Sequence, residues 1–248
     1  MITAGVDLSS QAAKTAACVI DWSDHRTTVT ELTLGVDDDS ISALIGRVDK
    51  LGIDVPLGWP IAFADAMSVY SSDGTWPADY RHTDNASYRY RRTDLWVWKN
   101  LGASPPLSVS ADRISLPAMR AAALLSRLPH RSARDGSGMV VEVYPAAALR
   151  RWDLPSRQYK RKENLEVRRE LVARFLAETA RWLSIESSDV DLCIASDDAF
   201  DALVAALVAR AAAMGLVEPI PSEDLTSALR EGWIAVPTDG SLNRLAVG

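Results

Sequence analysis

Cysteine and histidine are scarce in this chain of 248 residues, which has two cysteines and three histidines. Cys18 and Cys193 are too few for a disulfide scaffold, and no CxxC or Cys/His spacing accompanies them. This pattern argues against a structural zinc site. So few thiols are typical of a reducing compartment, and we expect a cytoplasmic protein.

Long apolar runs are also missing. The longest, residues 199–217, is interrupted by Asp201 and Arg210. Charged residues at such positions indicate a core helix and not a membrane span. Residues 1–5 lack a basic segment that leads into an apolar run, so we expect no signal peptide. The sequence thus predicts a protein with no membrane partner.

Low-complexity tracts and internal repeats are absent as well. Apolar residues make up 48% of the chain and charged residues 24%, which is the usage of ordinary globular proteins and argues against extensive disorder. A chain of this length can bury a sizeable core. We therefore expect a single domain over residues 1–248.

The net charge of −6 hides an uneven distribution. Residues 81–174 carry 16 Arg and 3 Lys against 9 acidic residues, which gives +10, whereas the rest of the chain carries 8 basic and 24 acidic residues, which gives −16. Arginine makes planar, bidentate contacts that suit phosphate. A binding region for a polyanion and a set of solvated helix faces explain this composition equally well.

The spacing of apolar residues predicts a mixed α/β order. Strands are expected over residues 2–8, 14–21, 27–34, 52–57, 139–144 and 231–237, with a polar turn at 23–26, and helices over 40–51, 145–151, 164–183 and 196–214. The first three strands form an antiparallel meander in this interpretation. The order is compatible with a ribonuclease H-like sheet, in which three antiparallel strands are extended by parallel strands through helices.

The segment 59–138 does not follow this pattern. Its periodicity is weak, it is rich in tryptophan and tyrosine, and only residues 62–69 and 116–128 have helical spacing. It is too aromatic to be disordered. We interpret it as an insertion or lid on the scaffold.

Acidic residues break the hydrophobic pattern at four places where strands and a helix should be apolar. They are Asp7 near the end of the first strand, Asp54 in the fourth strand, Glu142 in the fifth, and Asp197, Asp198 and Asp201 at the start of the last helix. An ionised carboxylate among apolar neighbours is costly to bury unless it is paired or bound to a metal. The spacing does not decide between Asp197 and Asp198, because each lies within one turn of Asp201.

A divalent cation would relieve both the burial and the mutual repulsion of such carboxylates. Oxygen ligands without histidine or cysteine favour Mg²⁺ or Mn²⁺. Two such ions, ~3.5–4 Å apart, can clamp the attacking and leaving oxygens of a phosphodiester. Asp201 is the hardest of the acids to explain by structure alone, because it lies among apolar helix residues.

Each of the other acids also has a structural explanation. Asp7 can cap a turn, Asp54 can accept hydrogen bonds from the following loop, and Glu142 can pair with an arginine of the basic segment. Asp197 and Asp198 suit the first turn of a helix because of its dipole. The set is more specific than any member, because the acids fall at strand ends and at a helix start.

The order of these motifs resembles the RuvC-type branch of the ribonuclease H-like superfamily, and more closely domain-of-unknown-function family 429, described as predicted nucleases of that fold. The matching pieces are Gly5-Val6-Asp7-Leu8, Ile53-Asp54-Val55-Pro56-Leu57-Gly58, Arg91-Arg92-Thr93-Asp94, Val141-Glu142-Val143-Tyr144-Pro145, Tyr159-Lys160, Asp197-Asp198-Ala199-Phe200-Asp201-Ala202 and Glu231-Gly232-Trp233-Ile234. The resemblance implies a metal-dependent phosphodiesterase site. Its implied ligands are Asp7, Asp54, Asp198 and Asp201, with Glu142 nearby. RuvC-type proteins are often dimers, so it also allows a homodimer.

Basic residues that could hold substrate phosphate are Arg89, Arg91, Arg92 and Lys160. The three arginines flank an aromatic residue, a mixture that can position a phosphate and stack a base. Solvated ion pairs, such as one between Arg92 and Asp94, explain the same pattern.

Three functions are compatible with these features. The first is a nuclease or phosphodiesterase that uses Mg²⁺ or Mn²⁺ to hydrolyse a nucleic acid or nucleotide by a two-metal mechanism. The second is a binding module without enzymatic activity whose acids are structural. The third is an ATP-binding relative of actin and sugar kinases, but no later Asp-x-Gly phosphate loop supports it. The sequence does not identify the substrate.

Overall fold

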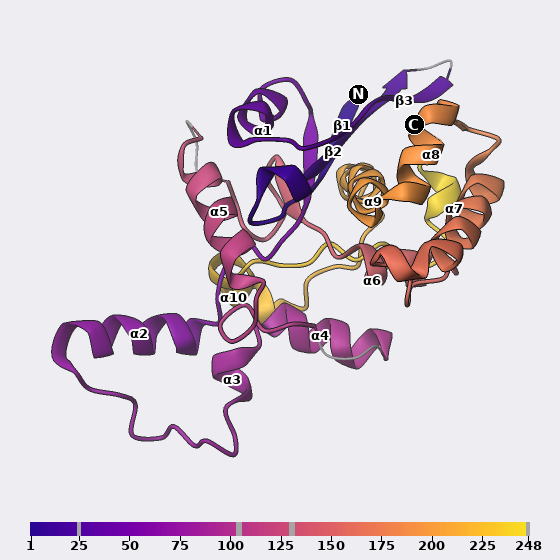
Figure 1. Cartoon of the computed structure of the whole chain (residues 1–248). Helices are drawn as coiled ribbons and strands as arrows, with labels where there is room; N and C mark the ends of the chain where they lie inside the picture. Colours follow the sequence, from indigo (N-terminus) through magenta and orange to yellow (C-terminus); the bar gives the residue numbers. More distant parts are fainter. Residues whose placement is uncertain (24–25, 103–105, 129–131, 247–248) are drawn as a thin grey trace.

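The computed structural model describes residues 1–23, 26–102, 106–128 and 132–246. Residues 24 and 25 of the turn expected at 23–26 lie outside the described residues. A twisted sheet lies at the centre of the molecule, and helices cover both of its faces (Figure 1).

The sheet has six strands in the order β5-β4-β1-β2-β3-β6. Their bounds are β1 Ile2–Asp7, β2 Ala16–Ser23, β3 Arg26–Leu34, β4 Lys50–Asp54, β5 Val140–Glu142 and β6 Leu183–Ser184. β1, β2 and β3 pair antiparallel, whereas β4 adds parallel to β1, β5 parallel to β4 and β6 parallel to β3. The mixed α/β sheet expected from the sequence, three antiparallel strands with parallel additions, is thus confirmed.

Helices lie between β3 and β4, between β4 and β5 and between β5 and β6, and three more follow β6 in the described part of the chain. Their bounds are α1 Asp38–Ile45, α2 Ile61–Asp73, α3 Ala86–Arg89, α4 Arg92–Leu101, α5 Ser115–Ser126, α6 Pro145–Arg151, α7 Leu165–Thr179, α8 Ser187–Ala195, α9 Asp197–Ala213 and α10 Leu225–Glu231, with short 3₁₀ turns at Ala12–Lys14, Lys162–Asn164, Ser222–Asp224 and Leu242–Arg244. Within the described ranges, none of these helices combines the length and apolar character needed to cross a bilayer.

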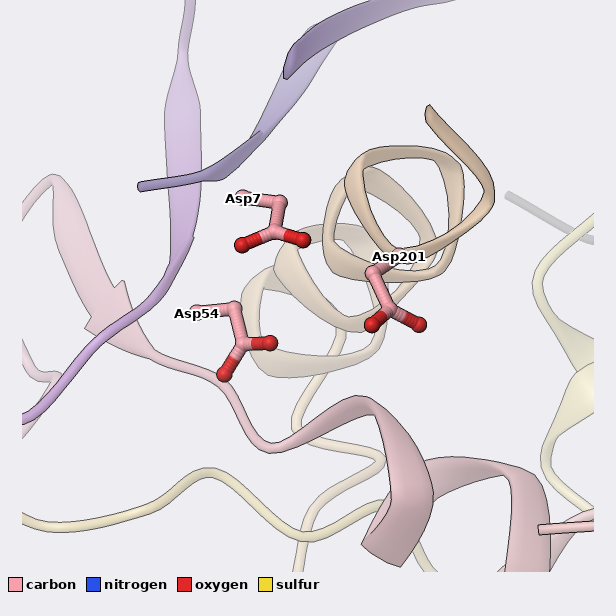
Figure 2. A group of neighbouring side chains, drawn as sticks. All are labelled: Asp7, Asp54 and Asp201. Atoms are coloured by element: carbon pink, nitrogen blue, oxygen red, sulfur yellow. The ribbon is translucent and has the colours of Figure 1, made fainter. Parts of the chain in front are cut away.

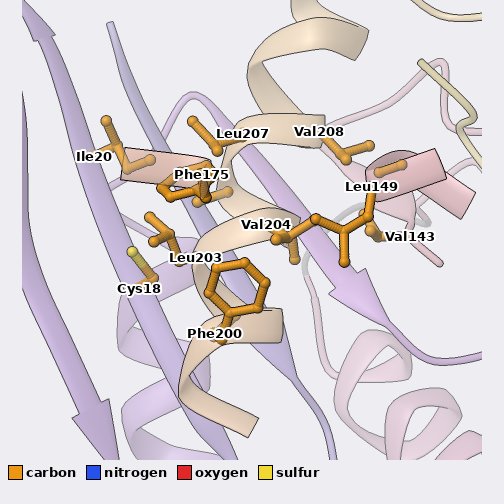
Figure 3. Close-up of a cluster of buried hydrophobic side chains, with 14 of the residues drawn as sticks. Cys18, Ile20, Val143, Leu149, Phe175, Phe200, Leu203, Val204, Leu207 and Val208 are labelled. Carbon is orange, nitrogen blue, oxygen red and sulfur yellow. The ribbon is translucent and has the colours of Figure 1, made fainter. Parts of the chain in front are cut away.

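The alternation of side chains along β2 creates two cores. Cys18 and Ile20 pack in the core that contains α9, together with Phe200 and Leu203 (Figure 3). Val19, between the two β2 residues, packs on the opposite face in the core that contains α1 and α5. Because successive strand residues point to opposite faces, alternate residues of β2 lie under α9. A register shift between β2 and β3 breaks this alternation in β3, where Val29 and Leu32 both pack in the α9 core.

Several element boundaries differ from those expected. The helix predicted over 164–183 ends at Thr179, because Leu183 and Ser184 pair with β3 as β6. The predicted final strand over 231–237 is wrong: Glu231 ends α10, and only isolated bridges at Ile234 and Pro237 join other segments. Gly232 adopts φ +86°, which ends the helix and redirects the chain.

The described residues of the segment 59–138 form four helices, α2 to α5, and not the two that were expected. Figure 1 shows α2 and α3 extending from the body, beside α4. The aromatic residues that made this segment distinctive pack largely on one another: Trp76 contacts the rings of Tyr70, Tyr80 and Tyr88. They form a partly exposed aromatic cluster on the extension.

Candidate metal centre

The site begins with two strands that end side by side. β1 and β4 are adjacent and parallel, and their register pairs Asp7 with Asp54 as the last residue of each strand. Gly5 and Gly52 are also paired, two residues earlier. The same pattern, Gly-x-Asp, therefore ends both strands and places both carboxylates on the same face.

The two glycines let α9 approach that face closely. A Cβ atom at Gly5 would overlap the backbone of Ala202 and Ala206, and one at Gly52 would overlap the backbone of Ala205. Glycine inside a strand often marks such a close approach of another backbone. The approach fixes α9 over the paired strands and sets Asp201, one turn before Ala205, beside their carboxyl ends.

Carboxylate oxygens of Asp7, Asp54 and Asp201 all lie within 4.8 Å of one another. Figure 2 shows the three side chains converging from β1, the end of β4 and α9. Asp201 is fully buried, whereas Asp7 and Asp54 are half-buried. We call these three residues the aspartate trio.

Two residues of the loop between α6 and α7 complete the surroundings of Asp201. The buried Tyr159 donates a hydrogen bond from its hydroxyl to Asp201 Oδ1 at 2.8 Å. The ammonium of Lys160 lies 2.6 Å from Asp201 Oδ2 and 3.8 Å from Asp54 Oδ2. The Lys160 side chain remains 47% exposed, so a cation lies between the trio and solvent.

Burial and mutual repulsion control the protonation of the trio. Burial, with the Asp54 and Asp201 carboxylates, raises the pKa of Asp7 well above its usual value. Burial raises the pKa of Asp54 to about 7, although Lys160 opposes the rise. The pKa of Asp201 is raised by burial and held back by Lys160 and Tyr159. Burial alone would lower the pKa of Lys160, but Asp201 raises it well above its usual value.

Glu142 lies beside the trio but is not one of its members. In the register it pairs with Ile53, whose side chain packs on the face opposite α9. Its carboxylate accepts two hydrogen bonds from the buried Arg91 guanidinium, at 2.6 and 2.7 Å, and one from the backbone N–H of Leu57 at 2.9 Å. Arg91 also pairs with Asp94 at 2.8 Å. Two features therefore separate Glu142 from the three aspartates. Its strand position places it on the other face of the sheet, and Arg91 is its partner there.

The acids at the start of α9 have different surroundings from Asp201. Asp197 accepts a hydrogen bond from the backbone N–H of Arg161 at 3.3 Å and lies 3.7 Å from the Arg168 guanidinium. Asp198 is half-buried and lies outside the aspartate trio, although burial and the carboxylates of Asp197 and Asp201 raise its pKa. Asp198 is thus a neighbour of the trio.

The four basic residues predicted to hold phosphate have different surroundings in the structure. Arg91 is buried between two carboxylates, and Arg92 pairs with Asp224 at 2.6 Å. Arg89 is exposed, and its guanidinium lies over the ring of Tyr90. Lys160 alone of the four contacts the trio among the described residues.

A cavity of about 490 Å³ opens beside the trio. Asp7, Asp54 and Lys160 line it, and so do Arg113 and Tyr144. Arg113 is exposed and has no ion-pair partner in the described part of the chain. Neither Arg113 nor Tyr144 was predicted from the sequence as a site residue. Tyr144 is the last residue of the strand expected over 139–144, two residues after Glu142, and this position is the signal that could have identified it.

The trio has the donor set that Mg²⁺ or Mn²⁺ prefers, carboxylate oxygens without nitrogen or sulfur. The charge of the cluster also supports this fit. The buried Asp201 Oδ2 lies 2.6 Å from the Lys160 ammonium. That single positive charge does not balance three ionised carboxylates, and a divalent cation would supply the rest.

Comparison with known proteins gives one match. A family model described as "Protein of unknown function (DUF429)" matches residues 5–226. That range includes the trio, Lys160 and the whole of the segment 59–138. No curated protein and no solved structure matches the chain.

Proposed function

The chain belongs to the DUF429 family, and for this member we propose hydrolysis of phosphodiester bonds in a nucleic acid or nucleotide with the help of Mg²⁺ or Mn²⁺. One observation carries the proposal: the strand ends and α9 bring Asp7, Asp54 and Asp201 within 4.8 Å of one another at the edge of a cavity. Three carboxylates this close repel one another in the absence of a cation.

The residues of the chain have distinct tasks in this proposal. The trio would hold the cation, which supplies Lewis-acid stabilisation of the charge that develops on phosphate. Tyr159 fixes the orientation of Asp201 by its hydrogen bond. Lys160 and Arg113 provide positive charge on the cavity wall, where a phosphate would lie.

The cavity favours a single nucleotide unit as the bound part of the substrate. Its volume of about 490 Å³ is within the range of small-ligand pockets, roughly 300–1,000 Å³. Apolar side chains such as Val55, Leu107 and Ile114 line it together with Tyr144. Such walls suit a base or sugar better than a continuous duplex backbone.

The first prediction concerns activity and metal binding together. We expect Mn²⁺ to bind the wild type in a calorimetric titration at low salt, and Asp7→Asn to lose both this binding and at least a hundred-fold of Mn²⁺-dependent hydrolysis, an effect of roughly 3 kcal/mol. The substrates are a dinucleotide, a single-stranded oligonucleotide and a duplex. Asp191→Asn, an exposed position on α8, is the matched control.

Retained full activity in the folded Asp7→Asn protein would remove the trio from the mechanism. A binding module is the second candidate, and the Lys160–Asp201 ion pair favours it because it already neutralises part of the cluster. Absence of both Mn²⁺ binding and hydrolysis in the wild type would support that function.

A further inference from the structure

The position of the Lys160 ammonium suggests how many metal ions the site takes. It lies 2.6 Å from one ligand oxygen of the trio and 3.8 Å from a second. The ammonium therefore already supplies positive charge to two of the three carboxylates. An ammonium is a hard, compact cation with three donors, so it can occupy such a position in place of a metal.

The loop that carries Lys160 is held in a strained conformation. Gln158 and Arg161, on either side of the Tyr159–Lys160 pair, adopt φ values of +57° and +75°. Non-glycine residues in these regions are uncommon and persist only when the surrounding structure enforces them.

Buried contacts enforce that conformation. The buried Arg168 guanidinium donates hydrogen bonds to the carbonyl oxygens of Tyr159 and Arg161, at 2.8 and 3.1 Å. Asp197 accepts from the backbone N–H of Arg161. The contacts before and after Lys160 leave its backbone little freedom, so the ammonium is placed by the fold.

The charges of the site agree with one metal ion. The ionised trio carries −3, which one divalent ion and the Lys160 ammonium balance to zero. Two divalent ions together with Lys160 would give +2 in a partly buried site. Asp198, the acid that would offset a second ion, lies outside the trio.

We propose that Lys160 is the built-in second cation of this site, so that the aspartate trio takes one divalent ion and the Lys160 ammonium faces the substrate phosphate. This inference rests on the proposed function and replaces the two-metal arrangement predicted from the sequence by one metal and one lysine. The half-exposed side chain of Lys160 on the cavity wall makes its ammonium accessible to a phosphate oxygen.

The experiment is a calorimetric titration of Mn²⁺ into wild type, Lys160→Met, Lys160→Arg and Lys162→Met. We expect one Mn²⁺ per wild-type chain. Lys160→Met removes the repulsion between the ammonium and the incoming ion, so we expect a second Mn²⁺ to bind or the first to bind about ten-fold more tightly. Lys160→Arg keeps the charge and should retain the wild-type stoichiometry. Lys162→Met, at an exposed position in the same loop, should match the wild type.

The outcomes separate this inference from the proposed function. Two Mn²⁺ ions on the wild type, with hydrolysis intact, would overturn the role of Lys160 and leave the function standing. Weaker Mn²⁺ binding by a folded Lys160→Met would show that the lysine only supports Asp201. No Mn²⁺ binding by any of the four proteins, together with no hydrolysis, would refute both proposals.

Discussion

Asp54 shows at the scale of one residue how the site affects stability. Burial raises its pKa to about 7 in the folded protein, whereas an unfolded aspartate has a pKa of about 3.9. The folded state therefore binds a proton that the unfolded state releases between these values. Stability from this group is lost as pH rises from about 4 to about 7, the opposite of the usual behaviour of a paired carboxylate.

Asp54→Asn should therefore stabilise the metal-free protein at high pH. We expect the variant to match the wild type near pH 4 and to exceed its free energy of unfolding by about 1–3 kcal/mol at pH 8. Urea unfolding in the presence of a chelator, repeated along a pH series, measures this difference.

Asp191→Asn controls for the loss of one surface charge and should track the wild type throughout. Saturating Mn²⁺ should stabilise the wild type but not Asp54→Asn, because only the intact trio binds the ion. A wild type more stable than Asp54→Asn at pH 8 without metal would contradict the burial argument.

At the scale of elements, the contact of β1 and β4 with α9 determines the geometry of the trio. Gly5 and Gly52 are required there because any side chain would overlap the helix backbone. The Thr3 hydroxyl donates to the Ala206 carbonyl on the same face, at 3.0 Å. The small residues Ala202, Ala205 and Ala206 on the helix complement the glycines.

Gly5→Ala should destabilise the protein by about 3 kcal/mol or more, because two backbones must separate to admit one methyl group. Mn²⁺ affinity should fall in the same variant, since α9 carries Asp201. Thermal unfolding and the calorimetric titration measure the two effects.

Gly46→Ala is the matched control for that change. Gly46 follows α1 with φ −70°, and an added Cβ would meet only ordinary contacts. We expect this variant to be neutral or up to about 1 kcal/mol more stable. Equal losses in both variants would show that the close approach of α9 is not the cause.

At the scale of the whole molecule, Arg91 joins the segment 59–138 to the sheet. Its guanidinium bridges Asp94 of α4 and Glu142 of β5 and also donates to the carbonyl of Glu231 at 3.2 Å. The Arg92 backbone N–H donates to the Glu231 carboxylate at 2.7 Å. One buried network thus holds three distant parts of the chain beside the cavity.

Arg91→Leu should lower the free energy of unfolding by about 3–5 kcal/mol, because it leaves two carboxylates buried without their cation. Urea unfolding measures this change, and limited proteolysis should show faster cleavage within residues 59–138. Arg89→Leu, an exposed neighbour, should remain within about 0.5 kcal/mol of the wild type. A similar small effect of Arg91→Leu would mean that the network contributes little.

The positive charge of residues 81–174 is also explained by contacts across the whole molecule. Several arginines of this segment pair with acids outside it: Arg92 with Asp224, Arg120 with Asp38 and Arg151 with Asp239. Its positive charge is therefore partly used to attach this segment to the acidic body. Within the cavity, the basic residues that remain accessible are Lys160 and Arg113.

The sequence by itself determined the five strands β1 to β5, the helix that became α9 and the acids that interrupt apolar elements. These are local patterns: alternation reports which strand face is buried, and an acid among apolar residues reports an unusual environment. The repeated Gly-x-Asp of β1 and β4 was also present in the sequence, and it marks the two paired strand ends.

Only the tertiary structure decided which acids converge. Glu142 and Asp54 look alike in sequence, but register places Glu142 on the other face, where Arg91 pairs with it. Lys160 reaches the trio from a loop whose path depends on Arg168 and on residues with positive φ. Such contacts join residues far apart in the chain, and the spacing of residues along a sequence does not specify them.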